Sequence, residues 1–296
     1  MAVTIPFDMS FTAPYRERQQ VMPGLARVLA ENPGPFTFKG SSAYFVGEDD
    51  VALIDPGPDT PDHVEALKRA LGGRRLTHIF VTHTHIDHSP AAAPLKAWSG
   101  ATTYGFGPHG SGRLLEGPEA EAGGDRDFIP DVALKDGEIV RANGFTIEAV
   151  YTPGHCSNHM CYGWREQKAL FTGDHIMGWA TTVVGGPDGD MGEYIDSLKK
   201  VIARKDALLI PTHGGPIRDP QPYLQAYLDH RMEREAEIVA CIRDGLVTIP
   251  DMVARIYAKY DKALHAAAGR SVHSHLKRMA REGLVAEDNG RWRVAA

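Results

Sequence analysis

Short apolar runs alternate with polar turns through the first two thirds of the chain. Residues 43–47 and 51–55 are apolar and flank the acidic turn Glu48-Asp49-Asp50, which predicts a β-hairpin. Residues 61–71 predict a helix, because Pro61 suits a first helical position and apolar residues follow at helical spacing. Further strands are predicted over residues 76–82, 139–150, 169–172 and 207–211. Polar clusters follow these strands, which is typical of a sheet edge that carries a functional site.

The pattern changes after Pro220, where helical spacing replaces the short apolar runs. Three helices are predicted, over residues 223–243, 250–260 and 271–281. The dipeptide Asn289-Gly290, between two short apolar runs, then predicts a tight hairpin. Three helices followed by a hairpin is the order of a winged helix. We therefore expect a domain over residues 1–222 and a small winged-helix-like domain over residues 223–296.

Composition agrees with a folded protein of this size. The chain has 296 residues, 43% hydrophobic and 24% charged, which suits one large domain and a small one. The first 20 residues lack the apolar run of a signal peptide, and no later run is long enough for a membrane span. Three cysteines, Cys156, Cys161 and Cys241, cannot all pair, and so few in a long chain suit a reducing compartment. These features predict a cytoplasmic protein.

The densest polar cluster is Thr82-His83-Thr84-His85-Ile86-Asp87-His88, directly after a predicted strand. Three imidazoles and a carboxylate packed this closely favour a cation, and their donor atoms are those that zinc prefers. A single histidine would more often have a structural role. Four such residues at this spacing predict a metal site.

Three further clusters place a candidate ligand beside a glycine that allows a tight turn. They are Gly154-His155, Gly173-Asp174 and His213-Gly214, each at the end of a later predicted strand. Cys156, next to His155, is an alternative thiolate ligand, although a small supporting residue is the better interpretation. His159 and His175 are interpreted as supporting or core histidines rather than ligands.

The complete set, from Asp55 to His213, resembles the metallo-β-lactamase superfamily motif by motif. The resemblance implies an α+β fold, the αββα sandwich, in which two sheets present these loops at one edge. It implies three sets of ligands: His83, His85 and His155 for one ion, Asp87, His88 and His213 for a second, and Asp174 as the bridge. Asp55 matches a carboxylate of the family that supports the ligands without binding metal.

Two cations that share a water would lower its pKa enough to keep a hydroxide nucleophile near neutral pH. Asp87 would orient that hydroxide and accept its proton. The expected cofactor is a pair of zinc ions, with manganese and iron as alternatives. The resemblance therefore implies a metal-dependent hydrolase.

Within the superfamily, the chain is similar to the β-lactamase-like protein two subgroup, whose mitochondrial member is an endoribonuclease specific for single strands. The similarity is carried by residues 32–37, 178–183, 194–199 and 230–235 and by the winged helix. The chain departs from the subgroup at Ser41-Ser42-Ala43-Tyr44, where Thr-Asn-Thr-Tyr is usual. This departure removes an asparagine that could contact substrate.

Charge bears on the choice of substrate. The formal net charge is −6, which argues against a surface coated with phosphate-binding side chains. From Asp229 onward there are 12 Lys or Arg and 10 Asp or Glu, against 20 and 28 before it. On the predicted helix over residues 271–281, Lys277, Arg278 and Arg281 could contact phosphates. They could equally form a solvated face on a domain that shapes the cleft or joins a homodimer.

Three functions therefore stay open. The leading hypothesis is a dinuclear zinc phosphodiesterase acting on single-stranded RNA. The alternative is a glyoxalase II-like thioesterase, or a hydrolase of another small ester or lactone, which an acidic catalytic domain accommodates more easily. The third is a metal-responsive regulator that binds nucleic acid through the winged helix, although a regulator would have no use for seven ligands.

Overall fold

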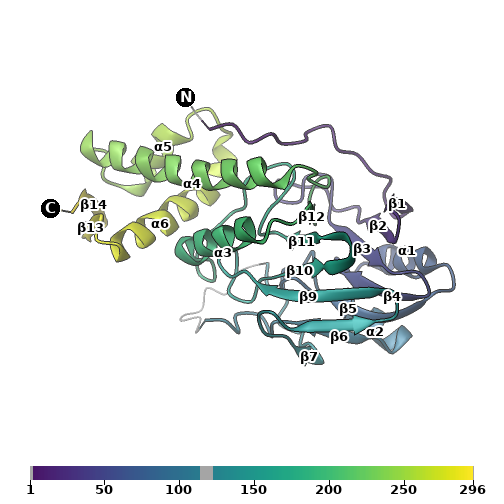
Figure 1. Cartoon of the computed structure of the whole chain (residues 1–296). Coiled ribbons are helices and arrows are strands. Elements are labelled where there is room, and N and C mark those ends of the chain that lie inside the picture. The colour runs from purple at the N-terminus through teal and green to yellow at the C-terminus, as the bar shows by residue number, and fades with distance from the viewer. Residues whose placement is uncertain (1–2, 114–122, 296) are drawn as a thin grey trace.

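Two sheets form the centre of the larger domain (Figure 1). The computed structural model describes residues 3–113 and 123–295. The seven-stranded sheet has its strands in sequence order: β1 (Arg18–Met22), β2 (Leu25–Leu29), β3 (Ser42–Val46), β4 (Asp50–Ile54), β5 (Arg75–Phe80), β6 (Thr102–Gly105) and β7 (Val132–Ala133). Neighbours are antiparallel from β1 to β4 and parallel from β4 to β7.

The second sheet has five strands. Their order is β12 (Leu208–Pro211), β11 (Ala169–Gly173), β10 (Met160–Trp164), β9 (Phe145–Tyr151) and β8 (Ile139–Ala142). Strands β11 and β12 are parallel, and the other neighbours are antiparallel. The 3₁₀ helix η1 (Arg165–Gln167) follows β10 and leads back into β11.

Alternating side chains give each strand two buried faces. In β3, Tyr44 and Val46 lie in the core between the two sheets, whereas Ala43 and Phe45 pack beneath α1 (Pro61–Leu71) and α2 (Ala92–Ser99). Helix α3 (Met191–Arg204) and the start of α4 (Pro220–Arg243) cover the outer face of the second sheet. The layers are thus helix, sheet, sheet, helix, and the predicted αββα sandwich is confirmed.

The C-terminal helices and hairpin form a separate core, seen at one side of Figure 1. Its elements are the end of α4, α5 (Ile249–Ile256), the 3₁₀ helix η2 (Lys262–Leu264), α6 (His265–Arg281), β13 (Val285–Asp288) and β14 (Arg291–Val294). The Asn289-Gly290 turn has φ of 50° and 75°, as the hairpin signal predicts. The predicted winged-helix order is therefore present. Helix α4 is continuous, and its two ends lie in the two cores.

Two helix boundaries differ from the predicted ones by four residues or more. Helix α5 ends at Ile256 instead of residue 260, and α6 begins at His265 instead of residue 271. The segment before Ser271 is rich in alanine and contains Gly269, so it shows no apolar stripe. Packing provides the missing constraint, because a Cβ at Gly269 would already lie 3.7 Å from Ile249 of α5.

The strand directions bring the candidate site residues to one edge. Strands β4 and β5 are parallel, as are β11 and β12, so the residues that follow each pair emerge at the same end. Within the described ranges, no helix is both long and apolar enough to cross a membrane.

Candidate metal centre

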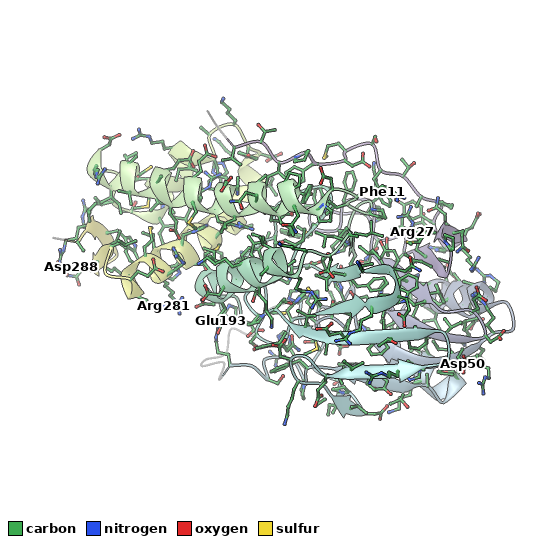
Figure 2. All side chains as sticks on the ribbon, in the orientation of Figure 1. Phe11, Arg27, Asp50, Glu193, Arg281 and Asp288 are labelled. Atoms are coloured by element: carbon green, nitrogen blue, oxygen red, sulfur yellow. The ribbon has the colours of Figure 1, made fainter. Side chains whose placement is uncertain are left out.

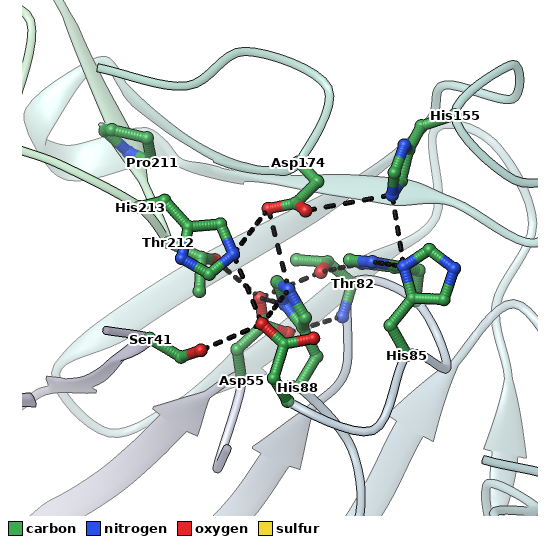
Figure 3. A network of polar contacts seen from close by, with 12 residues as sticks. Ser41, Asp55, Thr82, His85, His88, His155, Asp174, Pro211, Thr212 and His213 are labelled. Atoms are coloured by element: carbon green, nitrogen blue, oxygen red, sulfur yellow. Dashed lines mark hydrogen bonds and ion pairs between the residues drawn. The ribbon is translucent and has the colours of Figure 1, made fainter. Parts of the chain in front are cut away.

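All seven predicted ligands meet at this sheet edge, and they fall into two groups (Figure 3). The loop after β5 carries His83, His85, Asp87 and His88, while the loops after β9, β11 and β12 carry His155, Asp174 and His213 respectively. Segments far apart in sequence are thus brought together by the ends of four strands. The two groups that could hold a metal ion contain the seven residues that the sequence predicted as ligands.

The histidine half-site consists of His83, His85 and His155. The Nε2 atom of His83 lies 2.8 Å from Nδ1 of His85, which lies 3.1 Å from Nε2 of His155. Asp174 joins this group through Oδ2, at 3.7 Å from His155 Nε2. Three imidazole nitrogens therefore point at one position.

The carboxylate half-site consists of Asp87, His88 and His213. Asp87 Oδ2 lies 3.3 Å from His213 Nε2 and 3.5 Å from His88 Nε2. Asp174 Oδ1 lies 3.2 Å and 3.5 Å from the same two nitrogens. Figure 3 shows Asp174 between His155 on one side and His213 and His88 on the other, which is the place a bridging carboxylate would occupy.

The opposite ring nitrogen of four histidines has its own acceptor, and this fixes the tautomer. Nδ1 of His155 donates to the carbonyl of Val183 at 2.8 Å, and Nδ1 of His213 donates to that of Gly40 at 3.2 Å. A nitrogen that donates there leaves Nε2 with a free lone pair. Such outer contacts are typical of histidines that bind metal.

Asp55 supports both half-sites from below. Its Oδ2 accepts from Nδ1 of His88 at 2.9 Å and from the hydroxyls of Thr82 and Thr212 at 2.8 Å. Since Thr82 donates to Asp55, its oxygen accepts from Nδ1 of His83, 3.0 Å away. The structure therefore places Asp55 where the resemblance expected a supporting carboxylate, 1% exposed.

The electrostatics of the two half-sites differ. Burial and the neighbouring imidazoles hold the pKa of His83 well below its usual value. In the carboxylate half-site, burial also acts to lower the pKa of His88 and His213. The carboxylates of Asp87 and Asp174 outweigh burial and raise the pKa of His88 well above its usual value. The same carboxylates raise the pKa of His213 to about 10. Charge is thus balanced internally in the carboxylate half-site only.

These residues fit divalent metal ions. Buried Nε2 of His88 and Oδ1 of Asp174 have no hydrogen-bond partner, and a buried polar atom left unsatisfied costs about 1–3 kcal/mol. The donors are imidazole nitrogens and carboxylate oxygens, a set that suits zinc and related ions. A cation in each half-site would satisfy them all.

Other histidines and Cys156 stay outside the two groups. His159 accepts from the backbone N–H of Asp174 at 3.2 Å, and His175 is fully buried, so both have the supporting or core positions expected of them. Cys156 belongs to neither group of candidate ligands. Burial lowers the pKa of His175 to about 3, so this ring is neutral beneath the site.

Ser41 and Asn32 are polar contacts of the site that the sequence did not identify as such. The hydroxyl of Ser41 donates to Asp87 Oδ2 at 2.9 Å, and Nδ2 of Asn32 donates to that hydroxyl at 3.0 Å. In the sequence, Ser41 stands out only as a departure from a subgroup motif, and Asn32 only as part of residues 32–37, which carry the subgroup similarity. The contacts among Asn32, Ser41 and Asp87 form only in the folded chain, so no spacing pattern in the sequence predicts them.

The three basic residues predicted to contact phosphates lie on α6. Arg278 is paired with Glu235 at 2.6 Å and with Glu282 at 2.8 Å. Arg281 is paired with Asp190, 2.8 Å away, at the start of α3, and Figure 2 shows Arg281 and Glu193 close together where α6 meets α3. Lys277 is exposed. Two of the three charges are therefore already matched by carboxylates.

Family comparisons agree with this architecture. The model of the metallo-beta-lactamase superfamily matches residues 36–213, and that of the beta-lactamase associated winged helix domain matches residues 248–292. A solved beta-lactamase domain protein from Burkholderia ambifaria superposes with a TM-score of 0.80 at 18% identity, covering 98% of this chain and 97% of that one. The likeness to this solved structure shows the fold alone.

Two relatives indicate the range of chemistry nearby. The chain is 30% identical to an atrochrysone carboxyl ACP thioesterase of Claviceps purpurea, covering 81% of this chain and 74% of that protein. It is 29% identical to a beta-lactamase-like protein 2 homolog of Caenorhabditis elegans, covering 90% and 88%. The chain therefore belongs to the metallo-β-lactamase superfamily, as a hydrolase that ends in the associated winged helix domain.

Proposed function

We propose that the protein is a dinuclear zinc thioesterase that hydrolyses an acyl thioester. The observation behind this choice is the pairing of Arg278 and Arg281 with carboxylates, which already matches two of the three basic side chains predicted to contact phosphates. Residues before Asp229 carry 20 basic and 28 acidic side chains, so the metal-bearing domain would repel a polyanion. The thioesterase relative supports the same substrate class.

Each half-site would hold one ion with its three ligands, and Asp174 would be shared between the two ions. When bound, zinc would act as a Lewis acid toward the thioester carbonyl and would acidify a water molecule. Asp87 is the residue of this group with the most exposed carboxylate, at 21% against 12% for Asp174. This exposure supports Asp87 as the group that would take a proton from an entering water.

The reaction balances with this single proton acceptor. The water oxygen bonds to the thioester carbonyl carbon while Asp87 takes the proton. The carbon–sulfur bond then breaks, the thiolate leaves, and the proton passes to it. The products are a carboxylic acid and a thiol, and no serine or cysteine nucleophile is needed.

A second candidate is hydrolysis of single-stranded RNA, the leading hypothesis from the sequence. It is favoured by the exposed Lys277 and by the relative named a beta-lactamase-like protein 2 homolog, which spans more of the chain than the thioesterase does. A phosphodiester could use the same metal centre, since the ions would polarise a phosphoryl oxygen as readily as a carbonyl. The two candidates differ in what lies beyond the metals.

A direct comparison of substrates tests the proposal. Zinc-loaded protein is assayed side by side with a pantetheine or glutathione acyl thioester, a bis-aryl phosphodiester and a fluorogenic single-stranded RNA. We expect the highest kcat/KM on the thioester, and no activity in Asp87→Asn. A kcat/KM that is higher for RNA than for the thioester, and stays so after further purification of the protein, would contradict the thioesterase proposal and support the second candidate.

The double variant Lys277→Ala and Arg281→Gln separates the candidates further. Arg278 is left in place, because its removal would take away both of its hydrogen bonds to the buried Glu235. Thioester hydrolysis should be unchanged. If RNA is the substrate, KM for an oligonucleotide should rise, and the slope of log K against log salt should flatten by about 0.7 for each lost phosphate contact.

We also propose a cytoplasmic location. Cys156, Cys161 and Cys241 are all buried and form no disulfide with one another. Thiols kept in that state suit a reducing compartment. A fusion to a fluorescent protein, followed in intact cells, tests the location.

A further inference from the structure

We infer that Ser41 and Asn32 are positioning residues for Asp87, acting through the hydrogen-bond chain from the Asn32 amide to the Ser41 hydroxyl to Asp87 Oδ2. The inference deepens the proposed function, because it rests on Asp87 as proton acceptor. Neither residue would touch the substrate or a metal ion. Their effect would be to fix one orientation of the Asp87 carboxylate.

The contacts leave Ser41 little freedom. Its hydroxyl donates to Asp87 Oδ2 at 2.9 Å, and Figure 3 shows Ser41 pointing into the cluster of ligands. Its backbone N–H donates to Oδ1 of Asn32 at 2.9 Å. The residue is 1% exposed, so water does not compete for these bonds.

Asn32 sets the direction of the Ser41 hydroxyl proton. The Nδ2 group of Asn32 donates to Ser41 Oγ at 3.0 Å, which occupies an acceptor position of that oxygen. A hydroxyl has one proton, and here it can only be directed at Asp87. Because Asn32 also accepts from the Ser41 backbone, its amide is held in one orientation at both ends.

The loop that carries both residues is itself rigid. Thr37 donates to the carbonyl of Asn32 at 2.6 Å, and Gly34 and Phe38 exchange backbone hydrogen bonds of 3.2 and 2.9 Å. Gly40 has φ of 130°, and a Cβ there would lie 2.2 Å from the carbonyl of Ala30, so only glycine fits. The path of the loop at Ser41 is therefore fixed by its own contacts.

The same loop supports a second member of the carboxylate half-site. Gly40 directly precedes Ser41, and its carbonyl accepts a hydrogen bond from Nδ1 of His213. Residues 32–41 thus orient Asp87 and His213 together. With Oδ2 of Asp87 facing Ser41 and His213, the other carboxylate oxygen is the one left to accept a proton from the entering water.

Three variants test the pair. Ser41→Ala removes the donor to Asp87. Asn32→Asp keeps the shape but replaces the amide donor by an oxygen, so the Ser41 hydroxyl turns toward residue 32 and away from Asp87. Ser41→Thr retains the hydroxyl and should rescue function. The matched controls are Ser99→Ala, at the end of α2, and Asn143→Asp, in the exposed turn between β8 and β9, neither of which belongs to the candidate metal centre.

Two readouts are measured: kcat and KM for the thioester, and the chelator concentration that removes half of the bound zinc. In Ser41→Ala and Asn32→Asp we expect kcat to fall about 10- to 100-fold with KM little changed, and zinc to leave the carboxylate half-site at lower chelator concentration. Ser41→Thr and both controls should behave like the wild type. Thermal unfolding of each variant accompanies the assays.

The outcomes distinguish this inference from the proposed function. Normal kcat and normal zinc retention in both variants would overturn the inference, as would losses that simply follow a fall in Tm. Activity retained in Asp87→Asn would instead overturn the role of Asp87 itself. Zinc retention needs no substrate, so it tests the pair even if the thioester is the wrong substrate.

Discussion

The two halves of the metal centre are built on different electrostatic principles. In the histidine half-site three imidazoles lie 2.8 and 3.1 Å apart, and Asp174 is the carboxylate that joins them. In the carboxylate half-site, Asp87 and Asp174 both lie within 3.5 Å of the same two imidazole nitrogens. The first offers mainly imidazole nitrogens to a cation, whereas in the second the carboxylates raise the pKa of both rings, so that protons can take the place of a cation.

This difference predicts an order of metal affinity. Protons on His88 and His213 compete with metal, because the neighbouring carboxylates raise the pKa of both rings. No such competition exists at His83, whose pKa is lowered by burial and by its imidazole neighbours. We therefore expect the histidine half-site to bind zinc more tightly and the carboxylate half-site to empty first.

The largest effect is expected from Asp87→Asn. The amide is a poorer metal ligand and cannot accept a proton, so the loss of kcat should exceed the 10²- to 10⁴-fold typical of removing a general base alone. Zinc should leave the carboxylate half-site while the histidine half-site keeps its ion. Initial rates and zinc content check this, with the exposed Asp49→Asn as control. More than about a tenth of wild-type turnover would refute the role of Asp87.

A smaller effect is expected from Asp55→Asn. Asparagine suits the left-handed backbone at this position, where φ is 49°, so the fold should tolerate it. The loss of the acceptor for His88 should weaken zinc in the carboxylate half-site about 10- to 100-fold. The histidine half-site should suffer less, because it depends on Asp55 only through Thr82. Equal weakening of both half-sites, in a chelator titration, would contradict the comparison.

Arg231→Met tests the histidine half-site alone. The guanidinium donates to the carbonyl of Thr182 at 2.7 Å and covers the ring of Tyr194 at 4.8 Å, and the next carbonyl, that of Val183, holds His155. Removing this tether should weaken zinc there by less than about tenfold, because His155 keeps its direct partner. The exposed Arg243→Met on the same helix is the control. Loss of zinc from the carboxylate half-site instead would show that the tether serves the whole centre.

The smallest effect, on stability only, is expected from Asp190→Ala. Asp190 caps α3 by accepting from the backbone of Gly192 and Glu193, and it pairs with Arg281. Partial burial raises its pKa, but the hydrogen bond from Arg281 and the α3 amides outweigh burial and lower it. The cost should be about 1 kcal/mol at neutral pH. Zinc retention in both half-sites should stay normal.

The pH dependence of that cost has a definite sign. A carboxyl with a lowered folded pKa stabilises the protein above its unfolded pKa, and this contribution disappears as pH falls through the folded pKa. Denaturant unfolding of wild type and Asp190→Ala should therefore converge below about pH 4. A constant difference down to pH 2.5 would exclude the charge of Asp190 as its source.

What the sequence could predict here depends on how local the information is. The cluster from His83 to His88 lies within one loop, so its spacing alone predicted a metal site. The contact between Asn32, Ser41 and Asp87 joins two loops that are distant in sequence, and no period or spacing encodes it. Such contacts become visible only when both loops are placed at one sheet edge.

The basic residues of α6 also depend on tertiary contacts that the sequence does not predict. Sequence placed Lys277, Arg278 and Arg281 on one helix, and it could not show that Glu235 of α4 and Asp190 before α3 would face two of them. A run of cations is read as a binding surface only if nothing in the fold neutralises it. Tertiary pairing decides this, and here it favours a thioester over RNA as the substrate.

The most direct test of a two-ion centre with unequal half-sites is the zinc content during a chelator titration. Protein reconstituted with zinc and freed of excess metal should hold two ions per chain, as the two half-sites sharing Asp174 require. A chelator should remove them in two steps, and His213→Ala should abolish the step at lower chelator concentration while leaving the other in place. A content near zero after reconstitution, or loss of the tighter ion in His213→Ala, would contradict the account.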